Sequence, residues 1–242
     1  MSIHDNKLAD YIGKYPNLLQ FLERLDIELG FGDLSIGEIC DKNGIDYYFF
    51  TELLNLITKK YQFDPEYIDK FEISLTVRYL KNSHKDYLNT YIPKLKKCLT
   101  DLSNEEGDRM RDFMLLFRYF NEYETEFREH LNNEDNSIYP YVMNLSNTYN
   151  NDTIDEDFII KIQSNVIDDY LRHHDSLDYK LSDLKNLLIK YFKPFKNKEL
   201  VHTFLKTIYE LEEDLTLHEL IENQILFRQA KNIEEMILQR FK

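Results

Sequence analysis

Two stretches of the sequence place a histidine and a glutamate four residues apart, in the pattern His-x-x-x-Glu. The first pair is His130 with Glu134, and the second is His218 with Glu222. On an α-helix, residues four apart have Cβ atoms about 5–6 Å apart, so the two side chains of each pair share one face. An imidazole and a carboxylate placed in this way can bind adjacent metal ions, and the carboxylate can bridge them.

A lone histidine precedes each pair at a similar distance. His130 follows His84 by 46 positions, and His218 follows His174 by 44. This internal repeat of one lone histidine and one pair suits a centre with two metal ions. Neighbouring side chains on a helix diverge by about 100°, and position 174 continues an apolar stripe, so we expect His174 to be the ligand and His173 to face solvent.

The candidate residues lie on long segments whose apolar residues recur every three or four positions. The segments cover residues 73–99, 103–138, 156–192 and 198–227. This spacing predicts amphipathic helices that face a shared core, and therefore an all-α fold with a four-helix bundle. With only 6 Gly and 5 Pro, the chain has few of the residues that hairpins need.

Shorter helical segments flank the bundle. We expect a small helical domain over residues 1–62, the bundle over 70–230, and a short C-terminal helix over 231–242.

Polar residues interrupt the apolar stripes, and burying so many of them is costly unless they are paired or bound to a metal. For one pair alone, a core histidine hydrogen-bonded to a glutamate is the better interpretation, but six such residues on four stripes favour a metal centre. Histidine and carboxylate ligands with open positions favour iron or manganese, whereas a closed zinc site usually includes cysteine. The predicted ligands are His84, His130, Glu134, His174, His218 and Glu222.

Two further features have alternative interpretations. Glu106 lies on the second stripe, where it is either an additional ligand or, together with Ser103, a capping box at a helix start. Tyr87, Tyr123 and Tyr170 are either hydrogen-bond donors to the ligands or ordinary core residues.

The overall charge excludes one class of function. A net charge of −14 and a pI near 5.0 disfavour a nucleic-acid surface, which needs clustered Lys and Arg. The N-terminus lacks the features of a signal peptide, and no apolar run approaches the roughly 20 residues of a membrane span, so we expect a cytoplasmic protein without a membrane anchor. Cys40 and Cys98 are too few and too far apart for a disulfide framework.

At the candidate ligands the sequence resembles the hemerythrin-like (HHE) family of di-iron proteins, and within it the proteins for repair of iron centres (RIC), or iron-sulfur cluster repair. The matching motifs are SH at 83–84, IP at 92–93, HLNNEDNSIYP at 130–140, HD at 174–175 and LHELIENQILF at 217–227. FLERLDIELGFGD at 21–33 and EIC at 38–40 are similar to the family's N-terminal domain.

The resemblance implies two iron ions per chain with an oxo or hydroxo bridge, and Glu134 and Glu222 as bridging carboxylates. It implies a stress-response protein that reacts with NO, O2 or peroxide, or donates iron to damaged centres. The alternative is a non-catalytic sensor or carrier of O2 or NO that signals through the N-terminal domain to a protein partner or within a homodimer, because open coordination positions serve binding and turnover equally.

The sequence departs from the family in two places. Family members often have a further histidine between the first two motifs, where this chain has none and Glu106 could replace it. They also often have two adjacent cysteines in the N-terminal domain, where this chain has only Cys40. We therefore expect Cys40 to be a small core residue.

Overall fold

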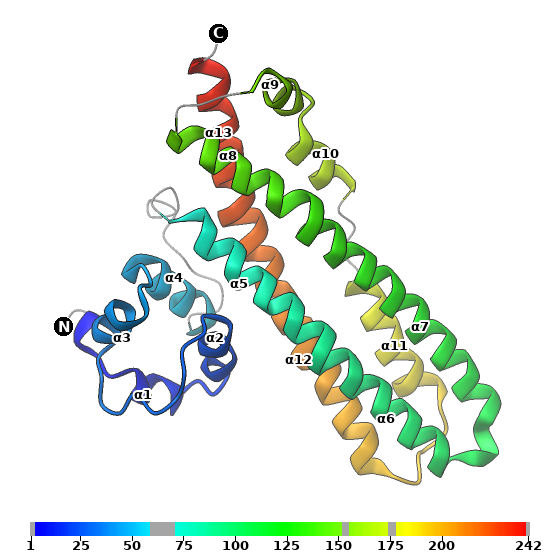
Figure 1. Cartoon of the computed structure of the whole chain (residues 1–242). Coiled ribbons are helices and arrows are strands. Elements are labelled where there is room, and N and C mark those ends of the chain that lie inside the picture. The colour runs from blue at the N-terminus through cyan, green and yellow to red at the C-terminus, as the bar shows by residue number, and fades with distance from the viewer. Residues whose placement is uncertain (1–2, 59–70, 152–154, 174–177, 241–242) are drawn as a thin grey trace. The chain divides into compact units, whose positions relative to one another are not determined.

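The computed structural model describes residues 3–58, 71–151, 155–173 and 178–240, and it is predominantly helical (Figure 1). No β-strand forms in these residues, and one isolated bridge pairs Lys7 with Ser35. The predicted all-α class is therefore confirmed. Within the same ranges, no helix is both long enough and apolar enough to cross a bilayer.

The helices fall into a group of short ones and a series of long ones. The short N-terminal helices are α1 (Leu8–Ile12), α2 (Leu18–Arg24), α3 (Ile36–Asn43) and α4 (Tyr47–Thr58). The remaining α-helices are α5 (Ile73–Asp86), α6 (Ile92–Glu105), α7 (Met110–Asn133), α8 (Tyr139–Asn151), α9 (Glu156–Gln163), α10 (Val166–His173), α11 (Asp178–Tyr191), α12 (Lys198–Ile221) and α13 (Phe227–Arg240).

The chain divides into two compact units that do not follow the predicted domain boundaries. The first unit comprises the described parts of 1–83, 141–167 and 217–242, and the second comprises those of 84–140 and 168–216. The N-terminal helices thus group with α8, α9 and α13 instead of forming a unit of their own. The expected boundary near 62–70 lies outside the described residues.

In the first unit, α3 begins with a capping box, and aromatic rings pack between the helices. Ser35 and Glu38 form a capping box at the start of α3, in which the Ser35 hydroxyl accepts from the Glu38 N–H and the Glu38 carboxylate accepts from the Ser35 N–H at 2.8 Å. The Phe21 ring lies 5.0 Å from that of Phe50 and 6.1 Å from that of Tyr79 on α5. These contacts join the short helices to the first long one.

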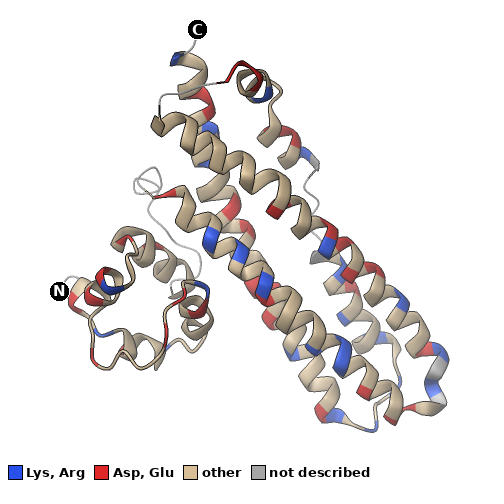
Figure 2. Ribbon diagram, viewed as in Figure 1, with Lys and Arg blue, Asp and Glu red and all other residues tan. Residues whose placement is uncertain are grey.

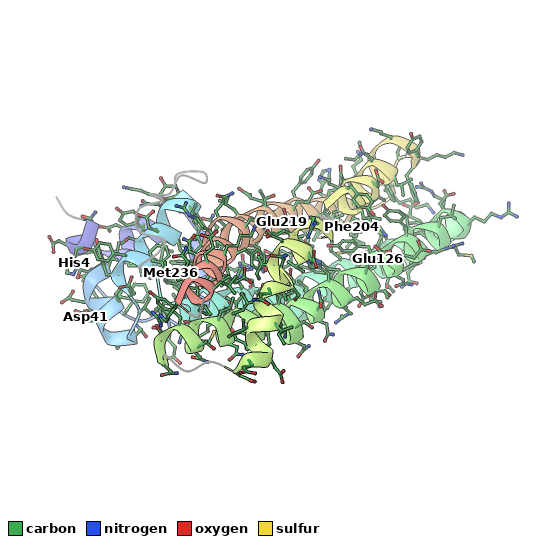
Figure 3. The ribbon with its side chains drawn as sticks, turned by 90° about the horizontal axis from the view of Figure 1, so that it is seen from above. His4, Asp41, Glu126, Phe204, Glu219 and Met236 are labelled. Carbon is green, nitrogen blue, oxygen red and sulfur yellow. The ribbon has the colours of Figure 1, made fainter. Side chains whose placement is uncertain are left out.

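In the second unit, α6, α7, α11 and α12 share one hydrophobic core. Phe113 and Phe120 of α7 meet Leu184 of α11 and Phe204 of α12 there, and all four are buried. Phe204 is labelled in Figure 3. These are positions that the three- and four-residue spacing predicted to face the core.

Charged side chains of both signs follow the outer faces of the same helices (Figure 2). Lys96 of α6 pairs with Glu124 of α7 at 2.9 Å, and Lys180 of α11 pairs with Glu126 of α7, which Figure 3 labels. The pairs link neighbouring helices around the core.

Three π-helical turns lie within the long helices without ending them. The turns span Tyr87–Tyr91, Glu134–Ile138 and Glu222–Leu226. The first joins α5 to α6 inside the predicted segment 73–99, whereas the second joins α7 to α8 and carries the helix from the predicted end at 138 as far as Asn151. The predicted C-terminal helix is the end of α13, which directly follows the third π turn.

Two of the π turns have a local cause in proline. Pro93 and Pro140 each stand two residues after a π turn, inside a continuous helix. A proline ring cannot donate a hydrogen bond and clashes with the carbonyl four residues earlier. That carbonyl belongs to Asn89 or Asn136, within the π turn, where the wider spacing relieves the clash.

The predicted third helix over 156–192 is wrong as a single element. It breaks at Ser164 and Asn165, between α9 and α10, and residues 174–177 lie outside the described residues. Asn165 adopts a positive φ of 56°, a conformation that asparagine tolerates better than most residues and that ends a helix.

Candidate metal centre

In the second unit, the carboxylate of Glu134 lies between two of the predicted histidine ligands. Nε2 of His130 is 3.0 Å from Oε1 of Glu134, and Nε2 of His84 is 3.3 Å from Oε2. Glu134 is fully buried and the His84 side chain is 1% exposed. A buried charge needs a partner, and the two imidazoles are the partners of the Glu134 carboxylate. The three side chains form one polar cluster.

Helix geometry explains how the first pair comes together. His130 lies on the last turn of α7, and Glu134 is the first residue of the π turn that follows it. The four-residue spacing brings both side chains to the same face, as the sequence predicted. His84, on the last turn of α5, supplies the imidazole that reaches the other oxygen.

His84 is held from its second nitrogen as well. Nδ1 lies 3.1 Å from Oδ1 of Asp135, the residue after Glu134. Tyr139 contacts the same imidazole, because its hydroxyl lies 3.3 Å from Nε2 and its ring stacks on the His84 ring at 5.5 Å. Neither Asp135 nor Tyr139 was predicted from the sequence, since on a regular helix Asp135 would point about 100° away from Glu134.

The pKa of His84 responds to these neighbours. Burial lowers the pKa, but hydrogen bonds to Asp135 and Glu134 outweigh it, so the pKa is raised above its ordinary value of 6.5. A metal ion that binds Nε2 must displace the proton there, so that metal binding competes with protonation.

Of the three tyrosines singled out in the sequence, Tyr170 contacts a candidate ligand. Its hydroxyl, on α10, donates to Oε1 of Glu134. Tyr87 and Tyr123 are buried core residues, with the Tyr87 ring 6.5 Å from His84 and the Tyr123 ring stacked on Phe127.

The first unit contains the second pair. Nδ1 of His218 lies 3.6 Å from Oε2 of Glu222, and the two side chains are 4% and 1% exposed. Glu222, like Glu134, is the first residue of a π turn. No proline follows this turn, so the local cause that applies to the other two is missing here. π turns inside α-helices are frequent at functional sites.

Two other predicted residues have different outcomes. His174 lies outside the described residues, and His173 is the last residue of α10. Glu106 is not part of the cluster, because α7, about 36 Å long at 1.5 Å per residue, separates it from Glu134. Its carboxylate accepts from the backbone N–H of Lys196 and lies 3.7 Å from Arg109.

The alternative capping box at Ser103 is also wrong. Glu106 is the C-cap residue of α6, and Ser103 lies inside that helix. Glu106 therefore joins the turn between α6 and α7 to the segment between α11 and α12, as a structural contact at one end of the second unit.

The candidate donors contact one another. In the described ranges, no three His, Cys, Asp or Glu side chains are grouped so that they could hold a metal ion. The nitrogens of His84 and His130 instead face carboxylate oxygens at hydrogen-bonding or ion-pair distances. The chemistry of the donors nonetheless fits iron, because buried imidazoles and carboxylates are the ligands of non-haem iron centres.

The buried cysteine of the N-terminal helices has different chemistry. Burial raises the pKa of Cys40 to about 12, and its side chain is 1% exposed. A thiol in this state is not a nucleophile at neutral pH. The prediction that Cys40 is a core residue agrees with this environment.

Comparison with known proteins adds no identification. No family model matches the chain, and no curated protein matches it. The resemblance to hemerythrin-like proteins therefore depends on the sequence motifs alone.

Proposed function

We propose that the chain is a hemerythrin-like protein of the iron-centre repair type, with a four-helix bundle that holds two iron ions. The observation that carries the proposal is the buried Glu134 carboxylate with the imidazoles of His84 and His130 on its two oxygens. Both oxygens of this carboxylate are directed toward imidazole groups, as a carboxylate that bridges two histidine-bound metal ions requires.

The second buried pair supports a second metal. His218 and Glu222 repeat the spacing, the buried glutamate and the π turn of the first pair. With His174, which the sequence pattern adds, the proposed ligands are four histidines, with Glu134 and Glu222 as bridges. An oxo or hydroxo group would complete the bridge between the ions.

When bound, the two irons would supply reversible electron transfer and open positions for NO, O2 or peroxide. The residues of the chain contribute in other ways. The apolar core excludes water, Glu134 and Glu222 offset the charge of the cations, and the Tyr170 hydroxyl holds the Glu134 carboxylate in place. Under nitrosative or oxidative stress, such a centre would consume these molecules or release iron to damaged clusters.

Turnover of NO separates this function from that of a sensor or carrier. Reduction of two NO to N2O and water takes two electrons and two protons. The iron-loaded, reduced protein should therefore produce about one N2O per two NO, and each cycle of a di-iron centre supplies both electrons. If NO binds without forming N2O, the reductive function is wrong and the module binds NO without turnover.

A further inference from the structure

Asp135 stands outside the predicted ligand set, yet it contacts one of its members. Its Oδ1 lies 3.1 Å from Nδ1 of His84, and the Asp135 side chain is 32% exposed. Glu134, one residue earlier, faces the other nitrogen of the same ring at 3.3 Å. One imidazole is thus held between two consecutive carboxylates.

The two carboxylates come from neighbouring residues of one helical turn. Neighbouring residues on a regular α-helix diverge by about 100°. Both residues lie in the π turn Glu134–Ile138, where more residues make up each turn and neighbouring side chains diverge less.

The two carboxylates compete for the proton of the neutral ring. A carboxylate can only accept, so a hydrogen bond to Asp135 requires the proton on Nδ1, whereas one to Glu134 requires it on Nε2. The Tyr139 hydroxyl, 3.3 Å from Nε2, fits the first arrangement, in which Nε2 carries a lone pair and accepts from the hydroxyl. The lone pair on Nε2 is also what a metal ion needs.

Resting on the proposed di-iron function, we propose that Asp135 is a positioning residue that keeps the His84 proton on Nδ1 and so reserves Nε2 for iron. A carboxylate behind a metal-bound histidine fixes the tautomer and ring orientation and makes the imidazole a stronger donor. The Tyr139 ring, stacked on His84 at an interplanar angle of 22°, holds the same orientation.

The second His-x-x-x-Glu pair offers a natural comparison. Asn223 follows Glu222 as Asp135 follows Glu134. An amide oxygen accepts a hydrogen bond but has no charge, so the two halves of the sequence repeat differ at this position. The inference therefore applies to His84 and to the iron that it binds.

The tautomer can be measured without any metal. In the metal-free protein, 15N NMR of His84 at a pH where the ring is neutral should show Nδ1 protonated. Asp135→Asn keeps an acceptor and should keep this tautomer, whereas Asp135→Leu, which has none, should move the proton to Nε2. Asn223→Leu, the matched control in the other pair, should leave His84 unchanged.

Metal affinity gives the second measurement. In competition with a chelator, Asp135→Leu should bind Co²⁺ about 10- to 100-fold more weakly than the unaltered chain, with Asp135→Asn between them and Asn223→Leu unchanged. If the unaltered chain binds metal and Asp135→Leu keeps both the tautomer and the affinity, the role of Asp135 is wrong but the proposed function is unaffected. A chain that binds no Co²⁺ or iron in any form would instead overturn the proposed function, and the ligand role of His84 with it.

Discussion

Replacement of Glu134 by glutamine removes the charge of the proposed bridge with little change in shape. The amide can still accept from Tyr170, whose hydroxyl donates to Oε1 of Glu134. It cannot neutralise a metal ion or bridge two of them, because an amide has no negative charge. We expect the variant to fold without metal and to lose the stabilisation that metal provides.

The magnitude follows from the linkage between binding and folding. A metal ion that binds only the native state, at 100 times its Kd, stabilises that state by about 2.7 kcal/mol. For a chain of this length, 1 kcal/mol shifts the Tm by about 2–4 °C. Anaerobic loading with Fe²⁺ should thus raise the Tm of the unaltered chain by about 5–11 °C for each site filled, and that of Glu134→Gln by much less.

Calorimetry of metal-free and iron-loaded protein measures both shifts. Glu129→Gln is the matched control, because Glu129 is an exposed glutamate on the same helix, next to His130, and its replacement makes the same change of charge. The control should keep the full shift. If Glu134→Gln keeps it as well, the carboxylate does not bind metal and the reasoning from its burial is wrong.

Three further predictions concern other parts of the chain. Burial raises the pKa of Cys40 to about 12 from an ordinary 9.0, so a thiol reagent at pH 8 should label Cys40 only in denaturant. The protonated thiol contributes its full stability below pH 9, and the free energy of unfolding should fall as the pH rises toward 12. Glu106→Gln should lower the Tm, since breaking a buried ion pair costs about 3–5 kcal/mol, while iron content stays the same; lost iron would restore Glu106 as a ligand. His174→Ala should lose iron and bleach the visible absorption of the oxidised protein, and His173→Ala should not; the reverse result would mean that the third apolar stripe is misassigned.

The sequence predicted the helical faces correctly because burial repeats with the helix period. Phe113, Phe120 and Phe204 lie in the core of the second unit, as the three- and four-residue spacing required. The four-residue spacing of His130 and Glu134 likewise brought an imidazole onto a carboxylate. Both results depend on local geometry, which a short stretch of sequence determines.

The π turns could not be predicted in the same way. The segment 103–138 was predicted to end just before Pro140, because proline removes one hydrogen bond and clashes with the preceding turn, but a wider turn keeps the helix continuous. The contact of Asp135 with His84 joins residues 51 positions apart. A spacing pattern within one segment does not predict such a tertiary contact.

Glu106 shows the opposite failure. Its place on the apolar stripe correctly indicated burial, and the side chain is 2% exposed. The stripe could not show how far along the helix the residue lay from the cluster, or that the Lys196 backbone would hold it. A periodic pattern predicts which face of a helix a residue lies on. Residues that form a site must also lie at the same height along the helix axis, which the pattern does not predict.

Iron content per chain tests the central claim most directly. The full-length protein, purified without chelators or loaded anaerobically with Fe²⁺ and desalted, should contain two iron ions per chain by elemental analysis. Glu134→Gln and Glu222→Gln should each lose the pair, whereas Glu129→Gln should retain it. One iron per chain, or none after loading, would contradict the account of the two His-x-x-x-Glu pairs as halves of a di-iron centre.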